Sequence, residues 1–207
     1  MAEVLRRVPH SAVRDAAVFD LLFVQADRHG ENVFVTEGGR LTLIDTRDNM
    51  LSASGLDSVF LPGTFIFQRN VVGNGRMFKP EAKRTTHHLV QTMLDYRCHV
   101  AGGAMGVEGL PAPVRKCAKE FAAAKPADLA ARFGLDGKQA EALQKVSKTL
   151  SERGFEAALK ETRYRHGVSG MPPEGYEWPE PCCDVEAEGS DQRCVAGAPQ
   201  GLPPGGG

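Results

Sequence analysis

Residues 27–45 read DRHGENVFVTEGGRLTLID, and this stretch decides how the rest of the chain is interpreted. Asn32 to Thr36 and Arg40 to Ile44 have the apolar or alternating pattern of β-strands. Glu37-Gly38-Gly39, between them, supplies residues that tolerate the backbone of a tight turn. The stretch therefore predicts a β-hairpin.

Three oxygen-bearing side chains stand at the ends of this predicted hairpin. Asp27 and Asn32 come before or at its first strand, and Asp45 follows its second. A hairpin returns the chain on itself, so we expect the three to converge on one point. Carboxylate and amide oxygens are ligands that suit Mg²⁺ or Mn²⁺.

Phosphoryl transfer uses such a set in this order. In protein kinases the catalytic-loop Asp is followed five positions on by a metal-binding Asn and, after a hairpin, by a metal-binding Asp. The pattern predicts Asp27 as the catalytic residue, which orients the substrate hydroxyl. It predicts Asn32 and Asp45 as ligands of Mg²⁺ or Mn²⁺, with ATP as the bound nucleotide.

The residues around the hairpin resemble a kinase family. The segments are AVFDLL at 17–22, DRH at 27–29, LTLID at 41–45 and SVFLP at 58–62. Together they resemble the C-terminal lobe of the Golgi casein kinase-like family of secretory-pathway kinases, over roughly residues 15–65. The resemblance implies an ATP-dependent transfer of the γ-phosphate to a hydroxyl of a protein or glycan.

In this interpretation Arg28 and His29 are supporting residues. We expect Arg28 to brace the loop by pairing with an acid. We expect His29 to pack or hydrogen-bond beneath the loop.

Three alternatives stay open. Asp-Arg-His-x-x-Asn, ending at Asn32, also resembles phosphatidylinositol 3- and 4-kinases, which implies a lipid acceptor. Arg47 stands where kinases of these groups have a Gly, and this favours a catalytically inactive, kinase-like binding module. In the third alternative the chain is a helical domain, and the residues 27–29 form only a loop salt bridge.

The expected fold class is α+β, mainly helical: the C-terminal lobe of a protein-kinase-like fold with one catalytic-loop hairpin and without an N-terminal lobe. Only 26 residues precede Asp27, and none of them is Lys. The predicted lobe covers residues 1–167, and a Pro- and Gly-rich, mostly disordered tail covers 168–207. The missing N-terminal lobe is therefore an expected partner.

Several helices are expected from the spacing of apolar residues and from the capping, Pro and Gly residues that begin or end helices. The first has Ser11 as its N-cap and runs through about Val24, and the second runs from Pro80 to about Cys98. Residues 114–160 are expected to be helical, with breaks near 125, 134 and 154. The stripes predicted to face the core there are Val114, Cys117, Ala118 and Phe121, then Ala140, Leu143, Val146 and Leu150, then Phe155, Ala158 and Leu159.

Composition excludes some classes of protein. Apolar residues make up 42% of the chain and the formal net charge is −1, so we expect a soluble globular protein that does not bind nucleic acid. No apolar run is long enough to suggest a membrane span. No signal peptide is visible, and the compartment is left open; the secretory pathway would follow if a further segment precedes Met1.

Overall fold

The computed structural model describes residues 2–46, 51, 55–62 and 93–162. Within these ranges the chain forms six α-helices and one two-stranded sheet, which confirms the expected α+β, mainly helical class. The helices are α1 (Ala2–Arg6), α2 (His10–Leu22), α5 (Ala112–Ala123), α6 (Pro126–Phe133), α7 (Gly137–Arg153) and α8 (Phe155–Glu161). The strands are β1 (Val33–Val35) and β2 (Leu41–Leu43), and short 3₁₀ helices include η1 (Gly30–Asn32), η3 (Tyr96–His99), η4 (Ala101–Gly103) and η5 (Val107–Gly109).

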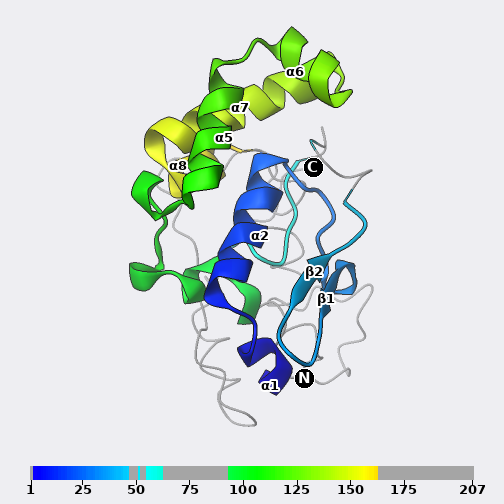
Figure 1. Ribbon diagram of the computed structural model, residues 1–207, viewed down its shortest axis with the longest axis vertical. Coiled ribbons are helices and arrows are strands. Elements are labelled where there is room, and N and C mark those ends of the chain that lie inside the picture. The colour runs from blue at the N-terminus through cyan, green and yellow to red at the C-terminus, as the bar shows by residue number, and fades with distance from the viewer. Residues whose placement is uncertain (1, 47–50, 52–54, 63–92, 163–207) are drawn as a thin grey trace, which may run out of the picture.

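Helix α2 lies at the centre of the described residues, with the hairpin along one side and α5 to α8 grouped at one end (Figure 1). It starts earlier than predicted, because Pro9 occupies the N-cap position with φ −60° and its carbonyl accepts from Ala12 and Val13. Proline suits a helix start, where its missing N–H costs nothing. Ser11 is exposed within the helix and is not its cap.

The hairpin is confirmed, with strands shorter by one residue at each end than predicted. Val33 pairs with Leu43 and Val35 with Leu41 in an antiparallel register. The odd-numbered side chains of the hairpin are half-buried and pack against the core, as the period of two in a strand requires.

The helices after residue 111 begin and end close to the predicted positions. Helix α6 ends at Gly134, whose φ is +66°, and α7 ends at Gly154, whose φ is +90°. The predicted stripes of α7 and α8 are buried. Helix α5 differs, since it begins at Ala112 and Cys117 is exposed at the margin of its stripe.

The prediction of a helix from Pro80 to about Cys98 is wrong at the C-terminal end of that helix. Only its last part is described, and there Met93 and Leu94 are helical. Asp95 then adopts extended backbone and its carboxylate caps η3 by accepting from Arg97 N–H. An Asp side chain that satisfies a nearby backbone donor stops a helix in this way. Residues 80–92 and the predicted tail, 168–207, lie outside the described residues.

One core joins these elements. It contains apolar side chains from α2, from residues 56–61 and from α7 and α8. Helix α7 packs on α5, α6 and α8 and also contacts α2. Among the described helices, none combines the length and the apolar character needed to cross a membrane.

Candidate functional site

The loop after α2 is held by a segment that comes later in the chain. Arg28 forms a parallel bridge with Ser58, in which Arg28 N–H donates to Asp57 O at 3.0 Å and Val59 N–H donates to Arg28 O at 2.9 Å. Asp57 N–H also donates to Gln25 O at 2.7 Å. Residues 57–59 thus support the loop around Asp27 through one isolated parallel β-bridge.

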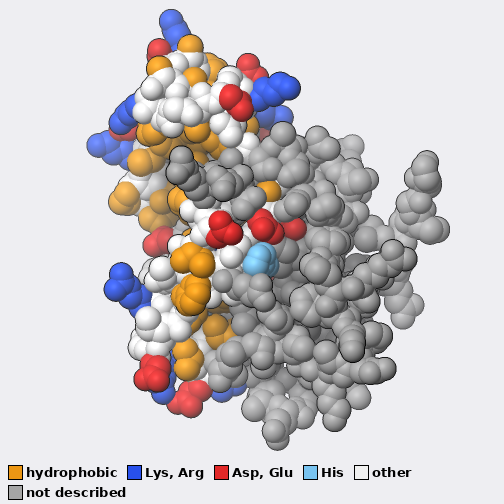
Figure 2. All heavy atoms as spheres, turned by 90° about the vertical axis from the view of Figure 1, so that its right-hand side faces the viewer, with side chains coloured by type: hydrophobic (Ala, Val, Ile, Leu, Met, Phe, Trp, Pro, Cys, Tyr) orange, Lys and Arg blue, Asp and Glu red, His pale blue; other side chains and the backbone are white. Residues whose placement is uncertain are grey.

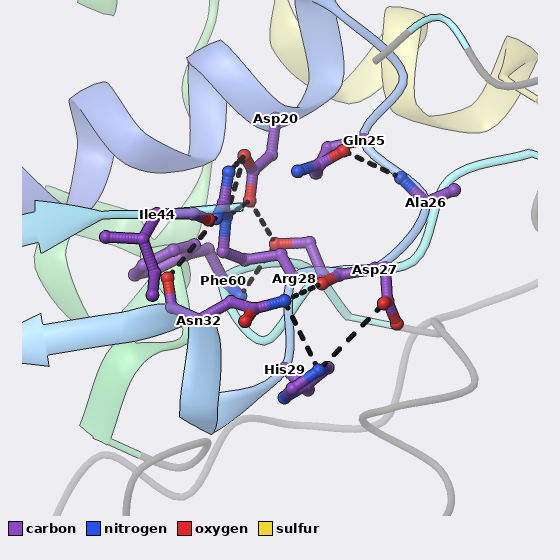
Figure 3. Close-up of polar contacts among 10 residues, drawn as sticks. Asp20, Gln25, Ala26, Asp27, Arg28, His29, Asn32, Ile44 and Phe60 are labelled. Carbon is purple, nitrogen blue, oxygen red and sulfur yellow. Dashed lines mark hydrogen bonds and ion pairs between the residues drawn. The ribbon is translucent and has the colours of Figure 1, made fainter. Parts of the chain in front are cut away.

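Arg28 and Asp20 form an ion pair inside the protein. Both side chains are fully buried, and Arg28 Nε lies 3.3 Å from Asp20 Oδ2 (Figure 3). Ser58 Oγ donates to the same carboxylate at 2.7 Å. Burial raises the pKa of Asp20 to about 6, against the lowering effects of the Arg28 charge and of the Ser58 hydrogen bond.

The Arg28 guanidinium also holds the base of the hairpin. Its Nη1 donates to Ile44 O at 2.6 Å and to Asn32 O at 3.3 Å. Ile44 N–H in turn donates to Asn32 O at 3.1 Å. These contacts fix the backbone of Asn32, and that of the residue immediately before Asp45, relative to the loop that carries Asp27.

The amide of Asn32 points back into the loop. Its Nδ2 donates to Asp27 O at 2.9 Å and lies 3.2 Å from His29 Nε2 (Figure 3). At this distance His29 Nε2 accepts, and a neutral ring therefore carries its proton on Nδ1. Asp27 Oδ2 is 3.9 Å from the same nitrogen, which is an ion-pair distance when His29 is protonated and too long for a hydrogen bond.

The amide orientation leaves Oδ1, the oxygen of the Asn32 side chain, with no hydrogen bond drawn to it among the residues of Figure 3. Asn32 is 6% exposed. Asp45 is exposed and has φ +52°, a left-handed conformation that Asp tolerates better than most residues. The left-handed turn after β2 therefore falls on Asp45 itself, while Arg47, two positions on, lies outside the described residues.

The side chains of Asn32 and Asp45 carry oxygen atoms of the kind that bind Mg²⁺ or Mn²⁺. Within residues 2–46, 51, 55–62 and 93–162, no group of three or more His, Cys, Asp and Glu side chains is arranged to hold a metal ion. Asn32 and Asp45 supply one amide and one carboxylate. Mg²⁺ commonly takes one or two carboxylates and completes its shell with water and substrate phosphate.

Sequence reasoning named the residues of the loop but missed the two that hold it. Asp20 and Ser58 both belong to segments quoted for the family resemblance, yet neither was assigned a role. One signal could have identified Asp20, because it is an acid within the otherwise apolar stretch AVFDLL. Buried acids are paired in folded proteins, and Arg28 is the cation one loop away.

Acidic side chains gather beside a histidine on the side of the molecule that carries the hairpin, with hydrophobic side chains next to them (Figure 2). Comparison of the chain with protein-family models, curated proteins and solved structures finds no match, so the site rests on its own residues and geometry.

Proposed function

We propose that this chain contains the phosphotransfer site of an ATP-dependent kinase, with the hydroxyl of a protein or glycan as acceptor. Asp27 orients the attacking hydroxyl. Asn32 and Asp45 bind Mg²⁺ or Mn²⁺ on the phosphates of ATP. Arg28 and His29 are positioning residues.

The observation that carries the proposal is the connection between Asn32 and the two acids. Its side-chain Nδ2 is bound to Asp27 O, and its main-chain oxygen accepts from the residue before Asp45. An acid, an amide oxygen and a second acid are thereby tied through the backbone to one end of the hairpin. Phosphoryl transfer depends mainly on such positioning and on charge stabilisation.

The chemistry of each protein residue follows from its exposure and contacts. The side chain of Asp27 is 39% exposed, so a hydroxyl can reach it and pass its proton to the carboxylate as the oxygen–phosphorus bond forms. The bond that breaks joins the γ-phosphorus to the bridging oxygen, and ADP leaves. A metal ion bound at Asn32 and Asp45 would neutralise charge on the phosphate oxygens.

An apolar surface beside the site suits the base of the nucleotide. Phe34 is 57% exposed and Ile44 is 40% exposed, and both lie on the outer face of the hairpin. An exposed aromatic ring can stack on a purine. Phe34→Ser should therefore weaken the binding of ATP and leave the binding of Mn²⁺ alone unchanged.

The proposal is tested by Mn²⁺ and ATP binding. Water-proton relaxation with Mn²⁺ should detect a ternary complex whose affinity falls at least about tenfold in Asp45→Ala, because the metal loses its one carboxylate. Glu37→Ala is the matched control, since it removes the same charge from the other end of the hairpin. Equal Mn²⁺–ATP affinity in wild type and Asp45→Ala would rule out the assignment.

A second candidate is a catalytically inactive, kinase-like module that binds a partner. The described site offers the metal a single carboxylate, Asp45, and this favours weak metal binding. ATP binding that does not depend on Mn²⁺ would support this candidate. For an active form, a panel of protein, glycan and phosphatidylinositol acceptors distinguishes the hydroxyl acceptor from the lipid alternative suggested by Asn32.

A further inference from the structure

Two histidines 89 residues apart meet away from the hairpin. His10 is the first residue of α2 and His99 is the last residue of η3. Their Nδ1 atoms are 2.9 Å apart, which is a hydrogen-bond distance. One of the two nitrogens must therefore carry a proton and the other must accept.

The other ring nitrogen of His99 decides which one donates. His99 Nε2 lies 2.7 Å from Met93 O, and a carbonyl oxygen can only accept. His99 Nε2 therefore carries the proton, and in the neutral ring Nδ1 is the acceptor. It follows that His10 donates through its Nδ1–H.

The orientation of the rings fits a shared proton better than a metal ion. The ring centroids are 4.9 Å apart whereas the two Nδ1 atoms are 2.9 Å apart, so the rings approach each other through their Nδ1 edges. A metal ion would need both lone pairs to point at a third position between the rings.

The surroundings of the pair oppose a second positive charge. Burial is the largest effect that lowers the pKa of His99 below its ordinary value of 6.5, and His10 and Arg14 lower it further. The Met93 carbonyl and Asp95 act in the opposite direction. Asp95 is itself paired with Arg97 at 2.7 Å, and the neighbouring Cys98 is disulfide-bonded and does not titrate.

We propose that the His10–His99 hydrogen bond is a proton-sensitive contact that holds the start of α2 against η3 and opens when His99 is protonated. Protonation of His99 on Nδ1 removes the acceptor of this hydrogen bond, so two Nδ1–H donors face each other beside the charged Arg14 and the rings separate.

The contact lies next to the segment that supports the loop. In η3, Tyr96 N–H donates to Phe60 O at 3.1 Å, and Phe60 N–H donates to Ser58 Oγ at 3.2 Å. An opening at η3 therefore acts on the segment that holds Asp20. The proposal itself does not depend on kinase activity.

Histidine NMR and amide exchange test the proposal on the full chain. At pH 8, long-range ¹H–¹⁵N spectra should give the Nε2–H tautomer for His99 and the Nδ1–H tautomer for His10. On acidification the protection factor of the Cys98 amide, which donates to Asp95 O, should fall by about tenfold per pH unit below the His99 transition.

His99→Gln keeps a neutral polar group and should abolish this acid-dependent loss of protection. His10→Gln can still donate to His99 but carries no charge, so it should raise the pKa of His99. His29→Gln is the control and should change neither result. An Nδ1–H tautomer for His99, a His99 transition at 6.5, or the same loss of protection in His99→Gln would each overturn the proposal.

Discussion

Arg28 makes contacts that no other cation could reproduce together. It is fully buried, its guanidinium pairs with Asp20, and the same group donates to the carbonyls of Asn32 and Ile44. A planar fork of five donors can serve several acceptors at fixed angles, whereas an ammonium group is a single point charge. Arg28 therefore joins α2, the loop and the hairpin base.

Arg28→Lys should lower the free energy of unfolding by about 2–3 kcal/mol, because buried acceptors lose their donors while the charge remains. Urea denaturation monitored by circular dichroism measures this change. Arg40→Lys, on the exposed surface of the same hairpin, should stay within about 0.5 kcal/mol of wild type. Equal effects of the two substitutions would contradict the role assigned to Arg28.

Asp20 makes stability depend on pH in an unusual direction. Its pKa rises from 3.8 to about 6 on folding, mainly through burial. Between pH 3.8 and about 6 the folded state binds more protons than the unfolded state. The stabilisation that Asp20 contributes through its raised pKa is therefore complete below pH 3.8 and is lost as pH rises through about 6. The shift corresponds to roughly 3 kcal/mol as an order of magnitude.

His99 acts in the opposite direction, because its pKa is lowered on folding. The stabilisation that His99 contributes through its lowered pKa is complete above pH 6.5 and is lost as pH falls below that value. Because His99 is present in both proteins, its effect cancels in the difference in unfolding free energy between wild type and Asp20→Asn. This difference, measured at pH 4.5–7.5, therefore reports the effect of Asp20. That difference should change with pH between 4.5 and about 6, and a flat difference would contradict the raised pKa of Asp20.

At the scale of elements, the hairpin is fixed at both of its ends. Its base is held by Arg28, and its turn packs against the residue that follows α1. Arg7 Nη1 donates to Glu37 O at 3.1 Å. A Cβ atom on Gly39 would lie 2.2 Å from Arg7 O, and φ at this position is +81°.

Gly39→Ala should lower the free energy of unfolding by at least about 1–3 kcal/mol, because the methyl group meets backbone and φ is positive. Thermal or urea unfolding measures the loss. Gly38→Ala is the matched control: its Cβ would meet only Thr36 Oγ1, at 3.9 Å, and φ is not positive there. A loss in Gly38→Ala as large as that in Gly39→Ala would show that close approach to Arg7 is not the cause.

At the scale of the whole molecule, the site lies on one side of a core that is mostly helical. The core extends from α2 through residues 56–61 to α7 and α8, while the hairpin presents Phe34 and Ile44 to solvent. Kinase catalysis also needs a loop that covers the phosphates and a Lys that binds them. Residues 2–22 form α1 and α2, and positions 1–26 contain no Lys.

The described residues before Asp27 supply neither feature, and the described site offers a metal ion one carboxylate, Asp45, so we expect the chain as given to bind Mn²⁺–ATP weakly and to transfer no phosphate in an Asp27-dependent manner. The measurement is incubation with labelled ATP, Mn²⁺ and a panel of hydroxyl acceptors. Asp27→Asn is the conservative comparison. Efficient transfer by wild type that Asp27→Asn abolishes would show that the chain covers the nucleotide with other residues.

The sequence by itself determined the features that depend on neighbours along the chain. The hairpin follows from strand period and turn residues, and the ends of α6 and α7 follow from Gly134 and Gly154, because each of these signals acts within a few residues. The order of Asp27, Asn32 and Asp45 could also be read directly. The convergence of their side chains stays a prediction, and the structure supports it only through the backbone contacts of Asn32 with Asp27 and Ile44.

Only the tertiary structure decided the contacts that hold these pieces together. Nothing local pairs Ser58 with Asp20, places Gly39 against Arg7 or brings His10 to His99. Ser58 and Asp20 are 38 residues apart, His10 and His99 are 89 residues apart, and Gly39 and Arg7 are 32 residues apart. Such contacts form because burial of the shared apolar core brings distant segments together, and the buried polar groups must then find partners wherever the packing places them.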